Sequence, residues 1–180
     1  MPGPGLGAGH LSLGSDRTTA GPGRDARGRL REEVPVDTTP CLFVLVGLPG
    51  SGKSTLASQW VAQDPARRAR VSRDDLRMML HSRLAWEQTW QEAQVTAVQH
   101  AAIAALLRAG VSVVADATNL LRRHRRALED IGRAAGARVE IRVVDTPVEE
   151  CIARDATRPD GRRVGADVIR RLARMAEWPT

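Results

Sequence analysis

Gly47-Leu-Pro-Gly-Ser-Gly-Lys-Ser54 is the stretch that decides the fold of this 180-residue chain. In the spacing G-x-x-x-x-G-K-[ST], the glycines let successive backbone N–H groups converge on an anion, and the lysine reaches the β- and γ-phosphates of a nucleotide. An apolar run precedes the loop at 41–46, and a helix-like run follows at 54–61. Strand, loop and helix is the order that a phosphate-binding loop requires, so we expect the chain to bind a nucleoside triphosphate.

Lys53 is the only lysine in the chain, and all other basic residues are arginines. A compact ammonium fits a phosphate nest, whereas a broad planar guanidinium does not. The alternative is a flexible turn in a glycine-rich chain, but a chance motif rarely has both a strand and a helix beside it. We expect ATP as cofactor and Mg²⁺ on the Ser54 hydroxyl. The predicted nucleotide contacts from this segment are Gly47, Pro49, Gly50, Ser51, Gly52, Lys53, Ser54 and Thr55.

Composition divides the chain near residue 40. Residues 1–40 hold half of the glycines and half of the prolines, with few large apolar side chains. Such a segment buries too little surface to offset its ordering entropy, so we predict a disordered tail followed by one domain over 41–180. Charges balance within the tail, so the net charge of +6 resides in the domain and favours anionic partners.

Cysteine usage and hydropathy indicate where the chain works. Cys41 and Cys151 lack the spacing of a disulfide or zinc pair, which predicts a reduced, cytoplasmic setting. No run of about 18 apolar residues occurs, so no membrane span is expected. The sequence leaves the oligomeric state open.

Short apolar, β-branched runs alternate with longer helical patterns, which is typical of an α/β fold with a parallel sheet. The predicted strands are 42–46, 70–72, 111–115 and 139–144. The predicted helices are 53–63, 75–84, 85–108, 121–135, 147–157 and 167–177. Ligands bind beyond the carboxyl ends of strands in such sheets. Polar residues at the ends of the first three predicted strands therefore mark the candidate site.

Asp74 follows the second predicted strand, which places it near the γ-phosphate of a bound nucleotide. Phosphoryl transfer to a hydroxyl needs a carboxylate that accepts the hydroxyl proton, and Asp74 is our candidate for this base. Asp75 is interpreted as a first-turn acid of the next helix, although both aspartates can alternatively be helix caps. Arg77 shares the helix face of Asp74 and is either an anion anchor for the substrate or a surface arginine.

Asp116 ends the third predicted strand, where an acid can hold a water of the Mg²⁺ shell or orient Ser54. Thr118 and Asn119 follow it and either line the acceptor cleft or cap the next helix. Asparagine is preferred at helix N-termini, so capping is the favoured role for Asn119.

Arg154 and Arg158 lie four residues apart on a predicted helix that leads into the turn-forming sequence 159–163. They are candidates for a lid that closes over the triphosphate, the alternative being a solvated face. The basic run 122–126 is interpreted as a solvated face or a weak nucleic-acid surface. Trp86 and Trp90, also four apart, are expected in one core patch, with base stacking as the alternative.

The motifs Gly47-x-Pro-Gly-Ser-Gly-Lys-Ser-Thr55, Ser72-Arg-Asp-Asp-x-Arg77, Asp116-Ala-Thr-Asn119 and Arg154…Arg158 together resemble the kinase domain of polynucleotide 5′-hydroxyl kinases, within the small AAA-type P-loop kinases. This resemblance extends over about 41–177. It implies a four-stranded parallel sheet of order 2-3-1-4 between helices. It also implies that Asp74 is the general base, Arg77 grips the acceptor's neighbouring phosphate, Asp116 supports metal and loop, and Arg158 contacts the ATP phosphates.

Three functions are compatible with these patterns. The first is an ATP- and Mg²⁺-dependent kinase whose favoured acceptor is the 5′-hydroxyl of RNA or DNA. The second is a kinase of a small hydroxylated molecule, such as a sugar, nucleoside or antibiotic. The third is a nucleotide-binding ATPase or switch without an acceptor. Arg77 separates the two kinases, because an anion anchor is useful only when the acceptor carries a phosphate beside its reacting hydroxyl. The third function predicts hydrolysis without an acceptor.

Overall fold

The computed structural model describes residues 39–84, 89–159 and 161–179. Four strands are present within them: β1 Cys41–Val46, β2 Arg68–Ser72, β3 Ser112–Asp116 and β4 Arg138–Val143. The helices of these segments are α1 Lys53–Ala62, α2 Arg73–His81, α3 Thr89–Arg108, α4 Arg122–Ala134, α5 Val148–Ala156 and α6 Ala166–Met175. The predicted tail falls almost wholly outside the described residues.

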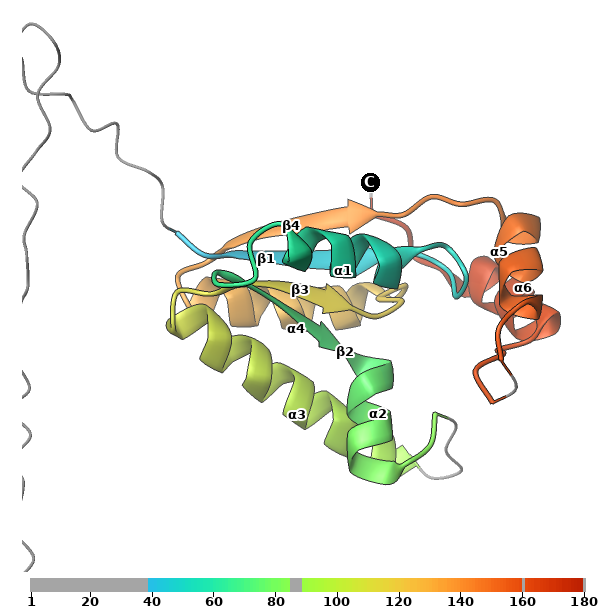
Figure 1. The fold of residues 1–180 in the computed structure, drawn as a ribbon, viewed down its shortest axis with the longest axis horizontal. Helices are drawn as coiled ribbons and strands as arrows, with labels where there is room; N and C mark the ends of the chain where they lie inside the picture. The colour runs from blue at the N-terminus through green and yellow to red at the C-terminus, as the bar shows by residue number, and fades with distance from the viewer. Residues whose placement is uncertain (1–38, 85–88, 160, 180) are drawn as a thin grey trace, which may run out of the picture. The chain divides into compact units, whose positions relative to one another are not determined.

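The strands form one parallel sheet in the order β2-β3-β1-β4 (Figure 1). This confirms the α/β class and the strand order implied by the family resemblance. In register, Ser72 at the end of β2 lies beside Asp116 at the end of β3. Because all strands are parallel, the carboxyl ends of β1, β2 and β3 meet at one edge.

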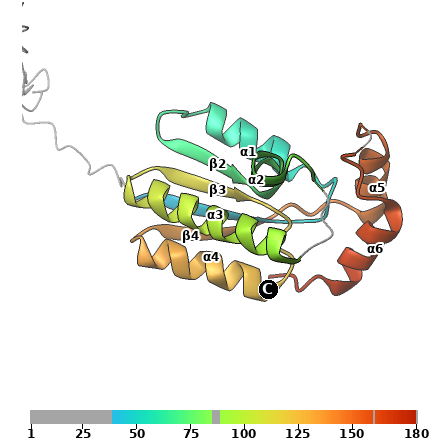
Figure 2. The same ribbon diagram turned by 90° about the horizontal axis from the view of Figure 1, so that it is seen from below.

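Helices cover both faces of the sheet, as Figures 1 and 2 show. Alternate residues of β1 point to opposite faces. Leu42 and Val44 pack with Ile103 of α3 and Leu128 of α4, whereas Leu45 packs with Ala57 of α1. Burial of each larger aliphatic side chain contributes about 1.5–3 kcal/mol to the stability of the fold. These two apolar layers hold the sheet edge in place.

A third apolar cluster joins α5 and α6 to the end of the central strand. Val46 and Leu48 pack there with Cys151 of α5 and Ile169 of α6. All four side chains are buried. The cluster therefore places α5 and α6 directly beyond the carboxyl end of β1, on the side where ligands bind in such sheets.

α2 begins two residues earlier than the sequence predicted. Ser72 is its N-cap, and the Ser72 hydroxyl accepts a hydrogen bond from the backbone N–H of Asp75 at 3.3 Å. Both Asp74 and Asp75 lie inside the first turn, where negative charge is favoured by the helix dipole. Asp75 is thus a first-turn acid as predicted, and the alternative that the two aspartates are caps is wrong.

The expected tryptophan core patch is not formed by Trp90, and Trp86 lies outside the described residues. The side chain of Trp90 is 56% exposed. The buried stripe of α3 repeats every four residues through Val95, Gln99, Ile103 and Leu107. Trp90 lies off that stripe, about 100° around the helix from the position that continues it. No helix of the described segments has the length and apolar character that crossing a membrane requires.

Candidate active site

The phosphate loop connects β1 to α1 and contacts both the segment after β3 and α5. The Gly47 N–H donates to the Thr118 carbonyl at 3.1 Å, which ties the loop to the segment after β3. Gly50 and Gly52 have φ of +85° and +96°, a region that side chains disfavour. A Cβ at Gly50 would lie 2.3 Å from the carbonyl oxygen of Cys151. The loop therefore packs directly on the first turns of α5 and needs glycine at this position.

Lys53 is the first residue of α1 and is buried. Its Nζ donates to the Leu48 carbonyl at 2.6 Å and to the Ser51 hydroxyl at 3.2 Å. Burial lowers the pKa of Lys53 to about 8, although the negative charge of Asp116 opposes this shift. An anion held by the loop would favour the charged ammonium again.

Asp116 is buried at the end of β3, and its carboxylate is bound by Arg70 of β2. Arg70 Nε donates to Asp116 Oδ2 at 2.8 Å, and Arg70 Nη2 forms an ion pair with the same oxygen at 2.7 Å. Arg70 Nη1 also donates to Asp75 Oδ2 at 2.6 Å. Desolvation acts to lower the pKa of Arg70, but these carboxylates outweigh it and raise the pKa. Arg70 thus links the Asp116 carboxylate to the first turn of α2.

These residues fit a magnesium ion that is held mainly by the nucleotide. Mg²⁺ keeps several waters and binds proteins through few oxygen ligands plus substrate phosphates. The Ser54 side chain is exposed at the start of α1, beside the loop. One oxygen of Asp116 is occupied by Arg70. The predicted role in which Asp116 holds a metal-bound water or orients Ser54 therefore fits better than direct ligation.

Asp74 and Arg77 form an ion pair on α2. The Asp74 carboxylate is exposed, whereas Arg77 is largely covered and is also held by Glu92 of α3 through its Nη2 at 3.0 Å. Glu92 additionally binds Arg73. The negative charge of Asp74, like that of Asp116, opposes the lowering of the Lys53 pKa by burial. The two carboxylates therefore lie within electrostatic reach of the loop ammonium.

Arg154 of α5 lies against the loop, and Arg158, two residues after α5, acts on the loop through its charge. A Cβ at Gly52 would be 3.6 Å from Arg154 Nη1. Arg154 also pairs with Glu150 one turn earlier. The positive charge of Arg158 lowers the pKa of Lys53. Both guanidinium groups thus contribute positive charge near the loop.

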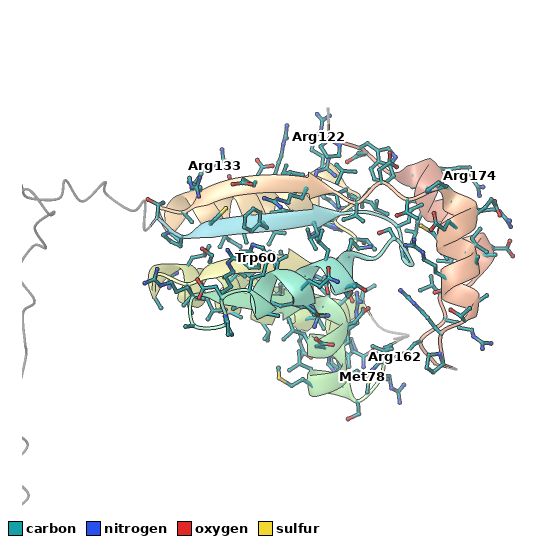
Figure 3. The ribbon with its side chains drawn as sticks, turned by 45° about the horizontal axis from the view of Figure 1, so that its top comes forward. Trp60, Met78, Arg122, Arg133, Arg162 and Arg174 are labelled. Atoms are coloured by element: carbon teal, nitrogen blue, oxygen red, sulfur yellow. The ribbon has the colours of Figure 1, made fainter. Side chains whose placement is uncertain are left out.

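Asp155 organises the chain between α5 and α6, a role that sequence reasoning missed. This buried carboxylate accepts the backbone N–H groups of Val164 and Gly165, both at 2.9 Å, and the Arg158 guanidinium at 3.2 Å. Figure 3 shows Arg162 on the segment between α5 and α6. Asp155 therefore fixes both the turn and Arg158.

Thr118 and Asn119 shape the segment after β3. Thr118 contributes its carbonyl to Gly47, as described above. Asn119 has φ of 44° and is buried, and its Nδ2 donates to the Leu45 carbonyl at 2.8 Å. The favoured capping role is wrong, because Leu121 is the N-cap of α4 and makes no side-chain cap. The amide of Asn119 instead fastens this turn to β1, and its burial leaves little surface for the predicted substrate contact.

The basic run 122–126 contains one buried residue. Arg125 donates to the carbonyls of Asn119 and Leu120, both at 2.9 Å, and to that of Glu177 at 2.6 Å. Arg122, Arg123 and Arg126 are exposed. The solvated-face interpretation is therefore wrong for Arg125, which joins the C-terminal segment to the turn after β3.

A family model described as an AAA domain matches residues 42–179. The chain belongs to this AAA-domain family. This AAA domain is also similar to a chain of the Pnkp1/Rnl/Hen1 RNA repair complex, with 33% sequence identity, a TM-score of 0.64, and coverage of 76% of this chain and 43% of that chain. It therefore spans less than half the length of that relative.

Two further structures share the fold. APS kinase CysC of Mycobacterium tuberculosis, in complex with AMPPNP and APS, has 23% identity and a TM-score of 0.55 over 66% of this chain and 70% of that chain. Kti12 of Chaetomium thermophilum, in complex with ADP-AlF3, has 23% identity and a TM-score of 0.62 over 77% and 81%. The AAA domain is thus a P-loop domain of kinase-like fold, which confirms the resemblance drawn from the motifs.

Proposed function

We propose that this AAA domain is an ATP- and Mg²⁺-dependent kinase that transfers the γ-phosphoryl group to the 5′-hydroxyl of a polynucleotide. The observation that carries the proposal is the Asp74–Arg77 pair beside the loop. Asp74 lies in the first turn of α2, which begins directly after β2 at the same edge of the sheet as the loop, and Arg77 follows one helical turn later. A proton acceptor and an anion anchor are thereby arranged side by side along one helix.

The donor side has the groups that bind and neutralise a triphosphate. The loop N–H groups and the N-terminus of α1 attract the phosphates, and the ammonium of Lys53 is close enough to bind them. Arg154 and Arg158 add positive charge from the α5 segment. Mg²⁺, when bound with the nucleotide, neutralises charge on the β- and γ-phosphates, with Ser54 and Asp116 as the residues that would position it.

On the acceptor side, Asp74 accepts the proton of the attacking hydroxyl. The acceptor oxygen forms its bond to the γ-phosphorus as the bond to the bridging oxygen of ADP breaks, so phosphorylated acceptor, ADP and one proton result. Arg77 binds the phosphate on the 3′ side of the acceptor nucleoside. Because Arg77 contacts Asp74 before substrate binds, that phosphate competes for Arg77 and releases the carboxylate toward the hydroxyl.

The similarity to a chain of an RNA repair complex supports a nucleic-acid acceptor for this domain. A kinase of a neutral small molecule has no use for the Arg77 anchor beside Asp74. An ATPase without an acceptor needs neither a proton acceptor for a hydroxyl nor an anchor for an acceptor phosphate. The Asp74–Arg77 arrangement therefore favours the first of the three candidate functions.

The proposal is tested by incubating the purified chain with γ-labelled ATP, Mg²⁺ and a panel of acceptors. The panel contains RNA and DNA oligonucleotides with a 5′-hydroxyl, nucleoside 3′-monophosphates, nucleosides and sugars, with 5′-phosphorylated oligonucleotides as the matched control. We expect label on 5′-hydroxyl ends and none on the control. Label on a sugar or nucleoside alone, or release of inorganic phosphate alone, would identify one of the other two functions.

A further inference from the structure

One face of α2 leads away from the loop toward an exposed aromatic ring. Asp74, Arg77 and His81 occupy positions i, i+3 and i+7, which lie on the same helix face. With a rise of about 1.5 Å per residue, Arg77 lies about 4.5 Å and His81 about 10 Å along the axis from Asp74. α2 starts at the edge of the sheet and runs away from it (Figure 1).

His81 meets Trp90 at the far end of this face. Their rings pack edge to face, with centroids 6.1 Å apart and an interplanar angle of 87°. This contact favours one orientation of the indole while leaving Trp90 56% exposed. By contrast, Trp60 is partly buried against Phe43 and lies under the Arg68 guanidinium. In a chain with four tryptophans, one phenylalanine and no tyrosine, an oriented and exposed indole is a scarce feature.

The acidic side chain nearest to Trp90 along α3 is paired with arginines. Glu92, two residues along α3, is bound by both Arg73 and Arg77, so its charge is offset. The side chain of Met78 is exposed on the neighbouring turn of α2 and adds apolar surface beside the face. Flat aromatic surface next to a phosphate anchor is the combination by which proteins bind single-stranded nucleic acid.

We propose that Trp90, oriented by His81, stacks the base of the second nucleotide of a single-stranded acceptor. The inference rests on the proposed function and specifies its substrate. From Asp74 outward, the α2 face offers a proton acceptor, a phosphate anchor and an aromatic ring. A single strand read from its 5′ end offers the hydroxyl, the first bridging phosphate and the second base in the same order. Since every base has a π-face, the subsite accepts any base.

The test compares Trp90→Ala and Trp90→Phe with wild type on three acceptors. These are a nucleoside 3′-monophosphate, a short 5′-hydroxyl oligonucleotide, and the same oligonucleotide with an abasic second position. Trp178→Ala is the matched control, because Trp178 is also exposed but lies after α6. We expect Trp90→Ala to raise KM for the intact oligonucleotide about 5- to 150-fold, with kcat little changed and Trp90→Phe close to wild type. KM for the other two acceptors should not change.

Equal KM values for wild type and Trp90→Ala on the intact oligonucleotide would overturn the subsite. So would a rise in KM that is the same for the intact and the abasic oligonucleotide. In either case transfer to 5′-hydroxyl ends by wild type would leave the proposed function standing. A wild-type protein that labels no nucleic acid would overturn both. Fluorescence titration without ATP provides a readout independent of catalysis. The oligonucleotide should quench the tryptophan fluorescence of wild type and of Trp178→Ala, and should quench that of Trp90→Phe much less.

Discussion

Arg77 and Asp74 form an ion pair one helical turn apart at the start of α2. Glu92 of α3 holds the same guanidinium, so Arg77 is fixed from two sides before any substrate binds. A phosphate of the acceptor can replace the Asp74 carboxylate as the partner of Arg77. Binding of the correct acceptor and release of the base are thereby coupled.

Replacement of Arg77 by alanine should selectively weaken the binding of acceptors that carry a phosphate. Hydrogen bonds to charged groups contribute about 1.5–3 kcal/mol, so we expect KM for 5′-hydroxyl oligonucleotides to rise about 10- to 150-fold, with the Kd for ATP unchanged. Steady-state kinetics with nucleosides as the comparison acceptor check this. Arg133→Ala, which removes an exposed arginine of α4, is the control. A similar loss of transfer to neutral nucleosides would contradict the anchor role.

Nucleotide binding should become weaker as the pH rises through about 8. Lys53 is half neutral near that pH in the free protein, whereas bound phosphates favour the ammonium. Binding at pH 8.5 must therefore take up a proton, and affinity falls by up to about tenfold per pH unit above the pKa. Calorimetry in two buffers of different ionisation enthalpy measures this uptake. Lys53→Arg, whose guanidinium stays charged, should show none.

Alanine at Gly50 should disrupt the loop far more than alanine at Gly110. Both glycines have positive φ, which costs an alanine about 1–2 kcal/mol. Gly110 has open space around it, whereas a Cβ at Gly50 meets the Cys151 carbonyl. We expect Gly110→Ala to lose only that amount in urea unfolding and to bind ATP normally. Gly50→Ala should lose more stability and also nucleotide affinity; equal effects of the two variants would refute the close packing of loop and α5.

Asp155→Ala should destabilise the protein and slow transfer. It leaves the N–H groups of Val164 and Gly165 without their acceptor and frees Arg158 from its anchor. Loss of a buried hydrogen-bond partner costs about 1–3 kcal/mol. We expect a loss of that size in the free energy of unfolding together with a lower kcat. Asp167→Ala, at an exposed position of α6, serves as control, and an unchanged kcat in Asp155→Ala would exclude a role for this carboxylate in positioning Arg158.

The elements and loop were predictable because their signals are local. A few consecutive residues are enough to identify the strand before Gly47, the glycines of the loop and the apolar runs. The sequence pattern predicts the second strand only at 70–72, because arginine and alanine dominate its start, whereas the strand begins at Arg68.

Several site residues could not be predicted because their partners come from distant segments. Arg70 bridges β3 and α2, and Glu92 receives two arginines from α2. Asp155 binds backbone groups beyond a turn. The role of Asn119 was misread for the same reason, since its amide reaches across to β1 instead of to its own helix. Trp90 was misassigned because a spacing of four fits a core stripe, whereas the actual stripe is offset by one position.

The rate of phosphoryl transfer by Asp74→Asn tests the central claim most directly. It should be measured under saturating ATP and 5′-hydroxyl oligonucleotide, with Asp75→Asn from the same helical turn as control. A general base contributes about 10²- to 10⁴-fold, so the account predicts a loss of that size in kcat, an unchanged Kd for ATP, and near wild-type transfer by Asp75→Asn. Transfer by Asp74→Asn within tenfold of wild type would contradict it.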